Sequence, residues 1–117
     1  MYTPKSCHTS FPGFVYGGLI ASLIDCHCIA SAAAGAYLSE GRSMGSQPAL
    51  RFVTASLKVD YLRPTPMGVT LEIRGRIKGV TGRKAVVEAR VLADGEVCAR
   101  GEVVAVQIPD SMKRKKV

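Results

Sequence analysis

The segment from Gly17 to Leu38 constrains the fold of this chain more than any other feature of its sequence. It reads GGLIASLIDCHCIASAAAGAYL and contains no proline and no polar face. As an α-helix, a segment of this length spans about 33 Å. A helix that is apolar or small on every side is expected to be surrounded by protein rather than laid on a surface.

A membrane span is the main alternative for an apolar segment of this length. Asp25 and His27 near its middle, its many alanines and serines, and the strand-like sequence that follows all argue against that alternative. We therefore expect a buried core helix and no association with a membrane.

After a loop at residues 39–48, the hydrophobic period changes from helical to two. In residues 50–62 Thr54 is expected on one face, and the apolar positions on the opposite face are Val53, Ala55, Leu57, Val59 and Tyr61. Three further strands are expected at residues 69–78, 84–93 and 96–108. Asp94-Gly95 between the last two is a strong signal for a tight hairpin.

The connections after residue 62 are short, which predicts an antiparallel meander. One buried helix followed by four long strands predicts an α+β fold, in which an antiparallel sheet is wrapped around one long central helix. A length of 117 residues fits a single domain, expected at residues 1–112.

The formal charge is +7, and four of the 16 basic residues lie at positions 113–116. Residues 113–117 are therefore expected to form a disordered basic tail. No basic stripe with interleaved aromatic residues is present, so we expect no nucleic-acid partner.

The cysteines are expected to be free thiols in a reducing, cytoplasmic compartment, because residues 1–5 lack the apolar run of a secretory signal. The grouping Cys26-His27-Cys28 suggests zinc at first. On a helix, however, successive side chains point about 100° apart and do not converge on one metal ion. We expect no metal ion and no cofactor, and small packing roles for most of the cysteines.

Two features of the helix carry chemistry. Gly17 and Gly18 open it, where backbone N–H groups have no intrahelical partner and a substrate carbonyl can approach closely. Such donors stabilise the oxyanion of acyl transfer. Asp25 is costly inside an apolar helix unless it is paired or catalytic. The alternative is that Asp25 pairs with His27 or with a partner chain and only holds an interface.

The stretch FPGFVYGG at residues 11–18, followed by Asp25, resembles the PaaI-like acyl-CoA thioesterases of the hot-dog-fold superfamily. That family has a PGxxHGG pattern with an aspartate nine residues after the histidine, and Tyr16 to Asp25 has this spacing. The VDYLRP sequence at residues 59–64 also looks like a family strand and its exit. The resemblance implies hydrolysis of an acyl-CoA to a free acid and CoA in a homodimer or homotetramer, with Asp25 as general base or nucleophile.

The resemblance also implies substrate-binding residues. Tyr16 replaces the family histidine, Ser10 takes the place of a family amide side chain, and Thr54 fits a strand hydroxyl that positions the attacking water. His8 lies in the same entry loop, and the residues expected near CoA phosphates are Arg63, Arg83 and Lys84. Family members usually begin with a further strand, so the resemblance leaves open whether the first strand of the sheet is present.

The distance between Gly17 and Asp25 along the helix predicts how subunits assemble. Gly17 and Asp25 are eight residues apart, or about 12 Å along one helix, so one thioester carbon cannot touch both. If both serve one reaction, they are expected to come from different subunits. Two other functions stay open at this point: a hot-dog hydratase or dehydratase, which would pair a histidine with an acid across the site, and a non-catalytic acyl-CoA-binding protein.

Overall fold

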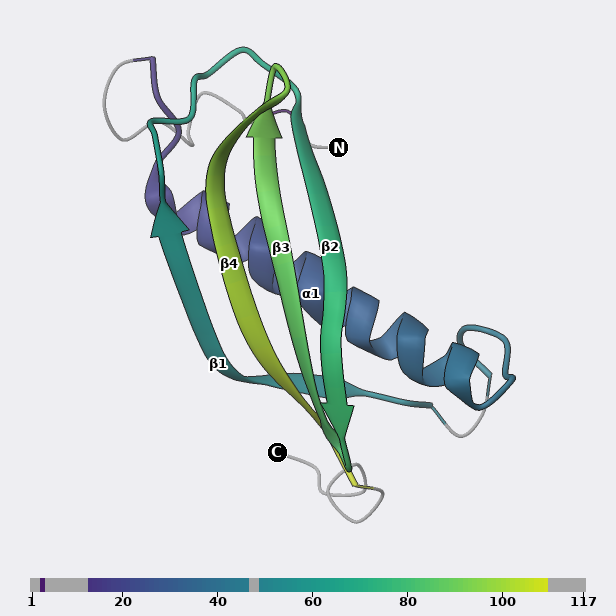
Figure 1. Ribbon diagram of the computed structural model, residues 1–117. Helices are drawn as coiled ribbons and strands as arrows, with labels where there is room; N and C mark the ends of the chain where they lie inside the picture. The colour runs from purple at the N-terminus through teal and green to yellow at the C-terminus, as the bar shows by residue number, and fades with distance from the viewer. Residues whose placement is uncertain (1–2, 4–12, 47–48, 110–117) are drawn as a thin grey trace, which may run out of the picture.

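The computed structural model describes residues 3, 13–46 and 49–109, and it consists of one helix on one sheet. Helix α1 (Gly17–Ser39) lies diagonally across one face of four antiparallel strands (Figure 1). The strands are β1 (Phe52–Tyr61), β2 (Leu71–Thr81), β3 (Lys84–Ala93) and β4 (Glu96–Gln107). A long helix packed on an antiparallel sheet is the architecture that the sequence predicts. Residues 113–117 lie outside the described residues, as does any strand between residues 4 and 12.

The strand order β1-β4-β3-β2 corrects the predicted meander. Strands β2, β3 and β4 do follow one another through short turns, and Asp94 and Gly95 in the last turn have φ values of 50° and 80°. Strand β1, however, pairs with β4 and not with β2. The loop after β1 therefore crosses the end of the sheet, and β1 and β2 are its two edge strands.

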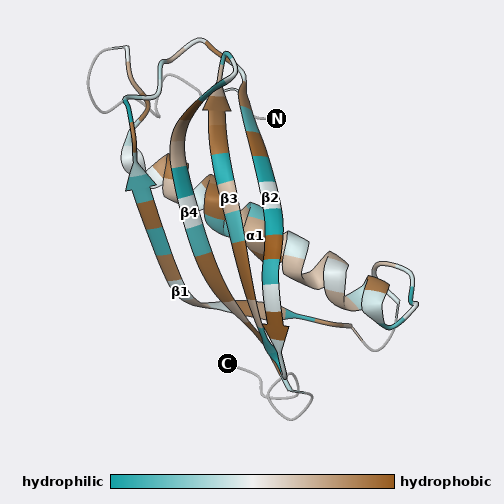
Figure 2. Cartoon of the chain, in the orientation of Figure 1, coloured by the Kyte–Doolittle hydropathy of each residue, from teal (hydrophilic) through white to brown (hydrophobic). Residues whose placement is uncertain are grey.

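Hydrophobic and hydrophilic residues alternate along the strands (Figure 2), and buried apolar residues of the strands form one core cluster with those of α1. The core between the two layers includes Ile20, Ile24, Leu71, Val87 and Val103, all essentially inaccessible to solvent. Gly101 in β4 brings the helix close to the sheet, because a Cβ atom at this position would lie 2.7 Å from Cγ2 of Ile24. This close approach fixes the height of the helix above the strands next to Asp25.

The helix is not surrounded within one chain, contrary to the expectation from its composition. Leu19, Ile20, Ile24, Cys28 and Ala32 are buried against the sheet, as in the core helix of a globular domain. The opposite side is exposed along a stripe of residues spaced by four: Gly18, Ser22, Cys26, Ala30, Ala34 and Leu38. Most of these residues are small, so their exposure leaves little apolar surface in water. Because every side of the helix has a similar composition, the sequence does not indicate which side the sheet covers.

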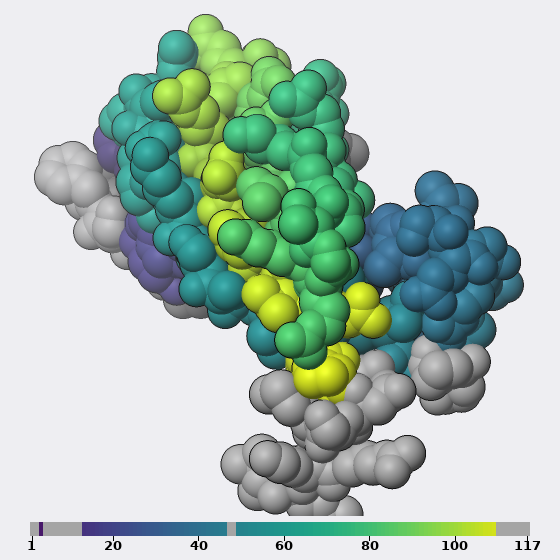
Figure 3. All heavy atoms as spheres, turned by 60° about the horizontal axis from the view of Figure 1, so that its bottom comes forward, coloured from purple at the N-terminus to yellow at the C-terminus, as the bar shows by residue number. Residues whose placement is uncertain are grey.

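The C-terminal turns of α1 and the loop after them project from the side of the sheet (Figure 3). Tyr37 anchors this region, since its hydroxyl accepts a 2.9 Å hydrogen bond from the backbone N–H of Leu50. The guanidinium of Arg42 stacks over the same ring at 5.1 Å from its centroid. Tyr37 is thus a packing residue.

Candidate functional site

Asp25 lies in the middle of α1 and faces edge strand β1. It is the only acidic residue in Gly17–Ser39 and is half-buried. Its Oδ1 accepts a hydrogen bond of 2.5 Å from the hydroxyl of Thr54 in β1. Within the described residues Oδ2 has no hydrogen-bond partner, so one carboxylate oxygen is held and the other is free to act on a ligand.

A β-bulge in β1 makes this hydrogen bond possible. The register with β4 shifts between Thr54 and Ser56, which leaves Ala55 as an extra residue. Because side chains alternate in a strand, the extra residue turns Thr54 to the helix side together with Leu57, Val59 and Tyr61. The predicted alternation is therefore right for residues after the bulge and wrong for Thr54, which was expected on the face opposite Leu57, Val59 and Tyr61.

The second element of the site is the start of α1. Tyr16 is the N-cap residue, and it makes no side-chain cap hydrogen bond; the first turn contains no acidic residue. The N–H groups of this turn are therefore not neutralised by side chains of the described residues. The aromatic ring of Tyr16 lies beside Gly18, where an added Cβ atom would be 2.6 Å from the ring.

Tyr61, at the end of β1, holds the start of the helix against the sheet. Its hydroxyl donates a 2.7 Å hydrogen bond to the backbone carbonyl of Gly17. A cavity of about 390 Å³ opens beside this contact, and its lining includes Gly17, Tyr61 and Arg63. The sequence predicted no role for the Tyr61 hydroxyl, because the role depends on a hydrogen bond to the backbone of Gly17, which lies 44 residues away in the chain.

His27 does not share a site with Asp25. Its ring lies over Gly75 in β2, where an added Cβ atom would be 2.8 Å from Nε2. Asp25 instead faces β1, at the other edge of the sheet. His27 is thus a packing residue whose side chain points away from Asp25, and the alternative in which Asp25 pairs with His27 is not what the structure shows.

Cys28, one turn after Asp25, is a buried thiol. Burial, with a smaller contribution from the Asp25 carboxylate, raises its pKa from 9.0 to about 11. The thiol is therefore neutral at physiological pH and is not a nucleophile. Of the described cysteines, Cys26 is exposed, Cys28 and Cys98 are buried, and all three are free.

The predicted phosphate-binding residues fall into two places. Arg63 lines the cavity at the start of α1 and pairs with Glu96 at 2.5 Å. Arg83 and Lys84 lie at the turn between β2 and β3, near Gln107. Gln107 is eight residues along β4 from Ala99, which pairs with Tyr61, so this turn lies about 27 Å from the start of the helix. His8 and Ser10 lie outside the described residues.

Comparison with known proteins identifies the family. Residues 12–100 match the family model described as the thioesterase superfamily. The chain belongs to the thioesterase superfamily. A structure of a thioesterase superfamily protein from Shewanella loihica PV-4 is 56% identical, with a TM-score of 0.73 over 92% of this chain and 80% of the other. The predicted hot-dog fold and the predicted membership of the thioesterase superfamily are thereby confirmed.

Two further thioesterases are similar to this chain. Acyl-coenzyme A thioesterase THEM4 of Xenopus laevis is 32% identical over 83% of this chain and 38% of its own length. The chain thus spans less than two fifths of the curated relatives it matches. A thioesterase from Thermus thermophilus, complexed with coenzyme A and Zn, shares the fold at 24% identity, covering 95% of this chain and 85% of the other with a TM-score of 0.68.

Proposed function

We propose that this protein hydrolyses an acyl-CoA thioester to a free acid and CoA. The observation that carries the proposal is Asp25, a half-buried carboxylate on an otherwise apolar helix, held at one oxygen by Thr54. Membership of the thioesterase superfamily and similarity to an acyl-coenzyme A thioesterase support this reaction class. The coenzyme A in the Thermus structure supports the same substrate class.

In the proposed reaction, the thioester carbonyl points at the N–H groups that open α1. These donors and the positive end of the helix dipole stabilise the oxyanion that forms when the carbonyl carbon is attacked. The free oxygen of Asp25 either takes a proton from the attacking water or attacks the carbonyl carbon itself. The CoA thiolate then leaves and is protonated. If Asp25 is the nucleophile, the acyl group remains on it as a mixed anhydride, and water then hydrolyses this bond to release the free acid and restore the carboxylate.

The two halves of this site come from two subunits. Gly17 and Asp25 lie on one continuous helix, about 12 Å apart by helical rise. Strand β1 is an edge strand that exposes apolar side chains, among them Leu57 and Tyr61. We propose that β1 pairs antiparallel with β1 of a second subunit, which covers both edges.

The pairing that joins the two halves places Thr54 next to Tyr61 of the partner subunit. Both side chains face the helix layer, and opposite residues of paired strands share a face. Thr54 donates a hydrogen bond to Asp25 of its own chain. The partner subunit's Tyr61 donates one to the backbone carbonyl of the partner subunit's Gly17. One carbonyl group then reaches an aspartate from one chain and a helix start from the other.

The same pairing brings three basic residues close together. Lys84 and Val53 are both registered with Val106 of β4, so Lys84 lies at the same height in the sheet as the start of β1. The start of β1 would lie against the end of the partner's β1, and so near Arg63 of the partner subunit. Arg83 and Lys84 from one chain would therefore approach Arg63 from the other, in a position to bind the phosphates of CoA. Within one chain these residues lie far apart.

Release of free thiol from a panel of acyl-CoAs tests the proposed reaction. We expect thiol release that follows saturation kinetics, with the preferred acyl group identified by the highest kcat/KM. A matching panel of enoyl-CoAs, followed by loss of the conjugated double bond, separates a hydratase. Binding of acyl-CoA without thiol release would instead establish a binding protein and refute the proposed hydrolysis.

Thr54→Val is expected to lower kcat by about 10- to 100-fold, because a hydrogen bond to a charged group contributes about 1.5–3 kcal/mol and each 1.4 kcal/mol is about a factor of ten. Valine keeps the branched shape of the side chain, so the unfolding temperature should change little. Thr54→Ser keeps the hydroxyl and should restore most of the activity. Equal activity of the Val and Ser variants would show that the hydroxyl does not position Asp25.

A further inference from the structure

One peptide bond at the start of α1 has its acceptor and its donor in different surroundings. The bond joins Gly17 to Gly18, so its carbonyl belongs to Gly17 and its N–H to Gly18. A peptide unit is planar and trans, so the carbonyl and the N–H point in nearly opposite directions. A group that holds the carbonyl of Gly17 therefore also sets the direction of the N–H of Gly18.

The N–H of Gly18 is available to a ligand. The first N–H groups of a helix have no acceptor within it. In α1 the N–H of Leu19 is taken by the carbonyl of Tyr16 at 3.2 Å, and no described residue accepts a hydrogen bond from the N–H of Gly18. The cavity of about 390 Å³ at the start of the helix is lined in part by Gly17 and Tyr61. A donor of this kind stabilises the oxyanion in the proposed reaction.

The hydroxyl of Tyr61 holds the other side of this peptide. It donates a hydrogen bond of 2.7 Å to the carbonyl of Gly17, which is the usual length for a hydroxyl donor. A Cβ atom on Gly17 would lie 3.1 Å from the hydroxyl oxygen and 3.2 Å from Cζ of Tyr61, so glycine gives the phenol room to approach the backbone. A hydroxyl has one proton to donate. Because Gly17 takes that proton, the hydroxyl has none left for a substrate oxygen.

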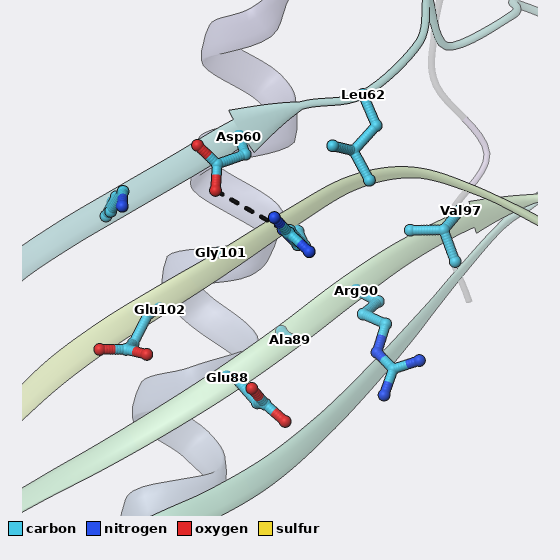
Figure 4. Close-up of a pocket in the computed structure, with 10 residues that line it drawn as sticks. Asp60, Leu62, Glu88, Ala89, Arg90, Val97, Gly101 and Glu102 are labelled. Atoms are coloured by element: carbon cyan, nitrogen blue, oxygen red, sulfur yellow. Dashed lines mark ion pairs between the residues drawn. The ribbon is translucent and has the colours of Figure 1, made fainter.

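Tyr61 is held in place from the strand side. Its neighbours Asp60 and Leu62 lie on the face of the sheet that points away from α1, where they border a hollow (Figure 4). Asp60 pairs with Arg100 of β4 at 3.6 Å. The N–H of Leu62 donates to the carbonyl of Cys98, also in β4, at 2.9 Å. Since side chains alternate along a strand, Tyr61 points to the other face, and its hydroxyl reaches the helix from a segment that is fixed to β4 on both sides.

The contact is not needed to satisfy either group. An α-helical carbonyl such as that of Gly17 already accepts the N–H of the residue four positions later. Tyr61 is 55% exposed in the single chain, so water can bond its hydroxyl. A hydrogen bond between two groups that have other partners contributes only modest net stability. Its main consequence is therefore its effect on the peptide that Gly17 shares with Gly18.

We propose that Tyr61 is a positioning residue of the thioester site, which aims and polarises the N–H of Gly18 through the peptide shared with Gly17. This role rests on the proposed hydrolysis and adds a residue that does not touch the substrate. Hydrogen bonds in a chain strengthen one another by about 10–30% each, so a proton donated to the Gly17 carbonyl makes the Gly18 N–H a stronger donor. An oxyanion carries more charge than the carbonyl from which it forms, so the gain is largest in the transition state. All three residues belong to one chain, so the effect does not depend on how subunits pair.

Tyr61→Phe tests the proposal through kcat. Phenylalanine keeps the aromatic ring, so the variant is expected to fold. We expect kcat to fall about tenfold with KM unchanged, because the lost interaction is strongest in the transition state. Loss of a complete oxyanion donor costs about 10²–10³-fold, and Tyr61→Phe weakens one donor without removing it. An unchanged kcat would overturn the proposal.

Tyr37→Phe is the matched control. It removes a hydroxyl that bonds the N–H of Leu50 near the other end of α1. We expect a lower unfolding temperature, because the buried N–H loses its partner, and an unchanged kcat. Equal losses of kcat in the two variants would show a general effect of a lost hydroxyl on the fold, which would also overturn the role of Tyr61.

Infrared spectroscopy of a bound substrate measures the polarisation directly. The ligand is an acyl-CoA of the panel, isotope-labelled at the thioester carbonyl carbon and bound to the Asp25→Asn protein, which is expected to leave it intact. We expect the carbonyl stretch at a lower frequency than in free acyl-CoA, and the double variant Asp25→Asn/Tyr61→Phe should lose part of that shift. The same frequency in both proteins would contradict the proposal.

The carbonyl frequency also separates this role of Tyr61 from the proposed hydrolysis. If the parent protein binds acyl-CoA without releasing thiol, the hydrolysis is refuted and the frequency still decides the role of Tyr61. If the parent releases thiol but the carbonyl is not shifted in the Asp25→Asn protein, the hydrolysis stands and the role of Tyr61 is refuted. No binding of acyl-CoA would refute both.

Discussion

Asp25→Asn is expected to lower the rate of thiol release by at least two orders of magnitude while the fold and the assembly are kept. The substitution removes the charge and basicity of the carboxylate but keeps its shape, and the amide oxygen can still accept the hydrogen bond from Thr54. General-base catalysis typically contributes about 10²–10⁴-fold, and loss of a nucleophile costs at least as much. The measurement is kcat with the best acyl-CoA of the panel.

Asp94→Asn is the matched control for this variant. Asp94 lies in the turn between β3 and β4 with a φ of 50°, a conformation that asparagine adopts as readily as aspartate. The control should therefore keep full activity and stability. An Asp25→Asn protein with turnover within threefold of the parent would remove Asp25 from the mechanism and leave it as an interface residue.

The position of the helix and the spacing of its chemical groups could be predicted from the sequence. The apolar segment from Gly17 to Leu38 became a helix from Gly17 to Ser39, because two glycines and a proline-free apolar run mark its extent. The ranges of β3 and β4 were also close to the structure, since Asp94-Gly95 fixes their hairpin. Local signals are sufficient for elements of this kind.

Two features that build the site could not be predicted. The pairing of β1 with β4 joins segments far apart in the chain, and the periodicity of a strand does not identify its neighbour. The bulge at Ala55 follows from the same pairing, because the fit to β4 and the core decides where an extra residue is placed. The bulge turns Thr54 toward Asp25. Thr54 could therefore be named from the sequence as a candidate site residue, but the face of β1 on which its side chain lies could not be predicted.

The active site is expected to exist only where two subunits meet, and a mixing experiment tests this. Gly17→Val should inactivate the protein, because its side chain blocks the approach of a carbonyl to the start of α1. An added Cβ atom would lie 3.1 Å from the hydroxyl oxygen of Tyr61, a side chain that can move, so we expect the variant to fold. Circular dichroism checks the fold, and Gly17→Ala is the milder substitution if valine is not tolerated.

Subunit exchange between inactive Gly17→Val and inactive Asp25→Asn proteins should restore activity. In a heterodimer, the intact Asp25 of one chain meets the intact Gly17 of the other, which gives one working site and one site with both defects. If the two groups act across the interface, each heterodimer should have about half of the parental activity. They must act across it if both touch one carbonyl, because about 12 Å of helix separates them within a chain. Exchange proven by mass with no return of activity, or an active monomer in sedimentation, would show that one chain contains the whole site.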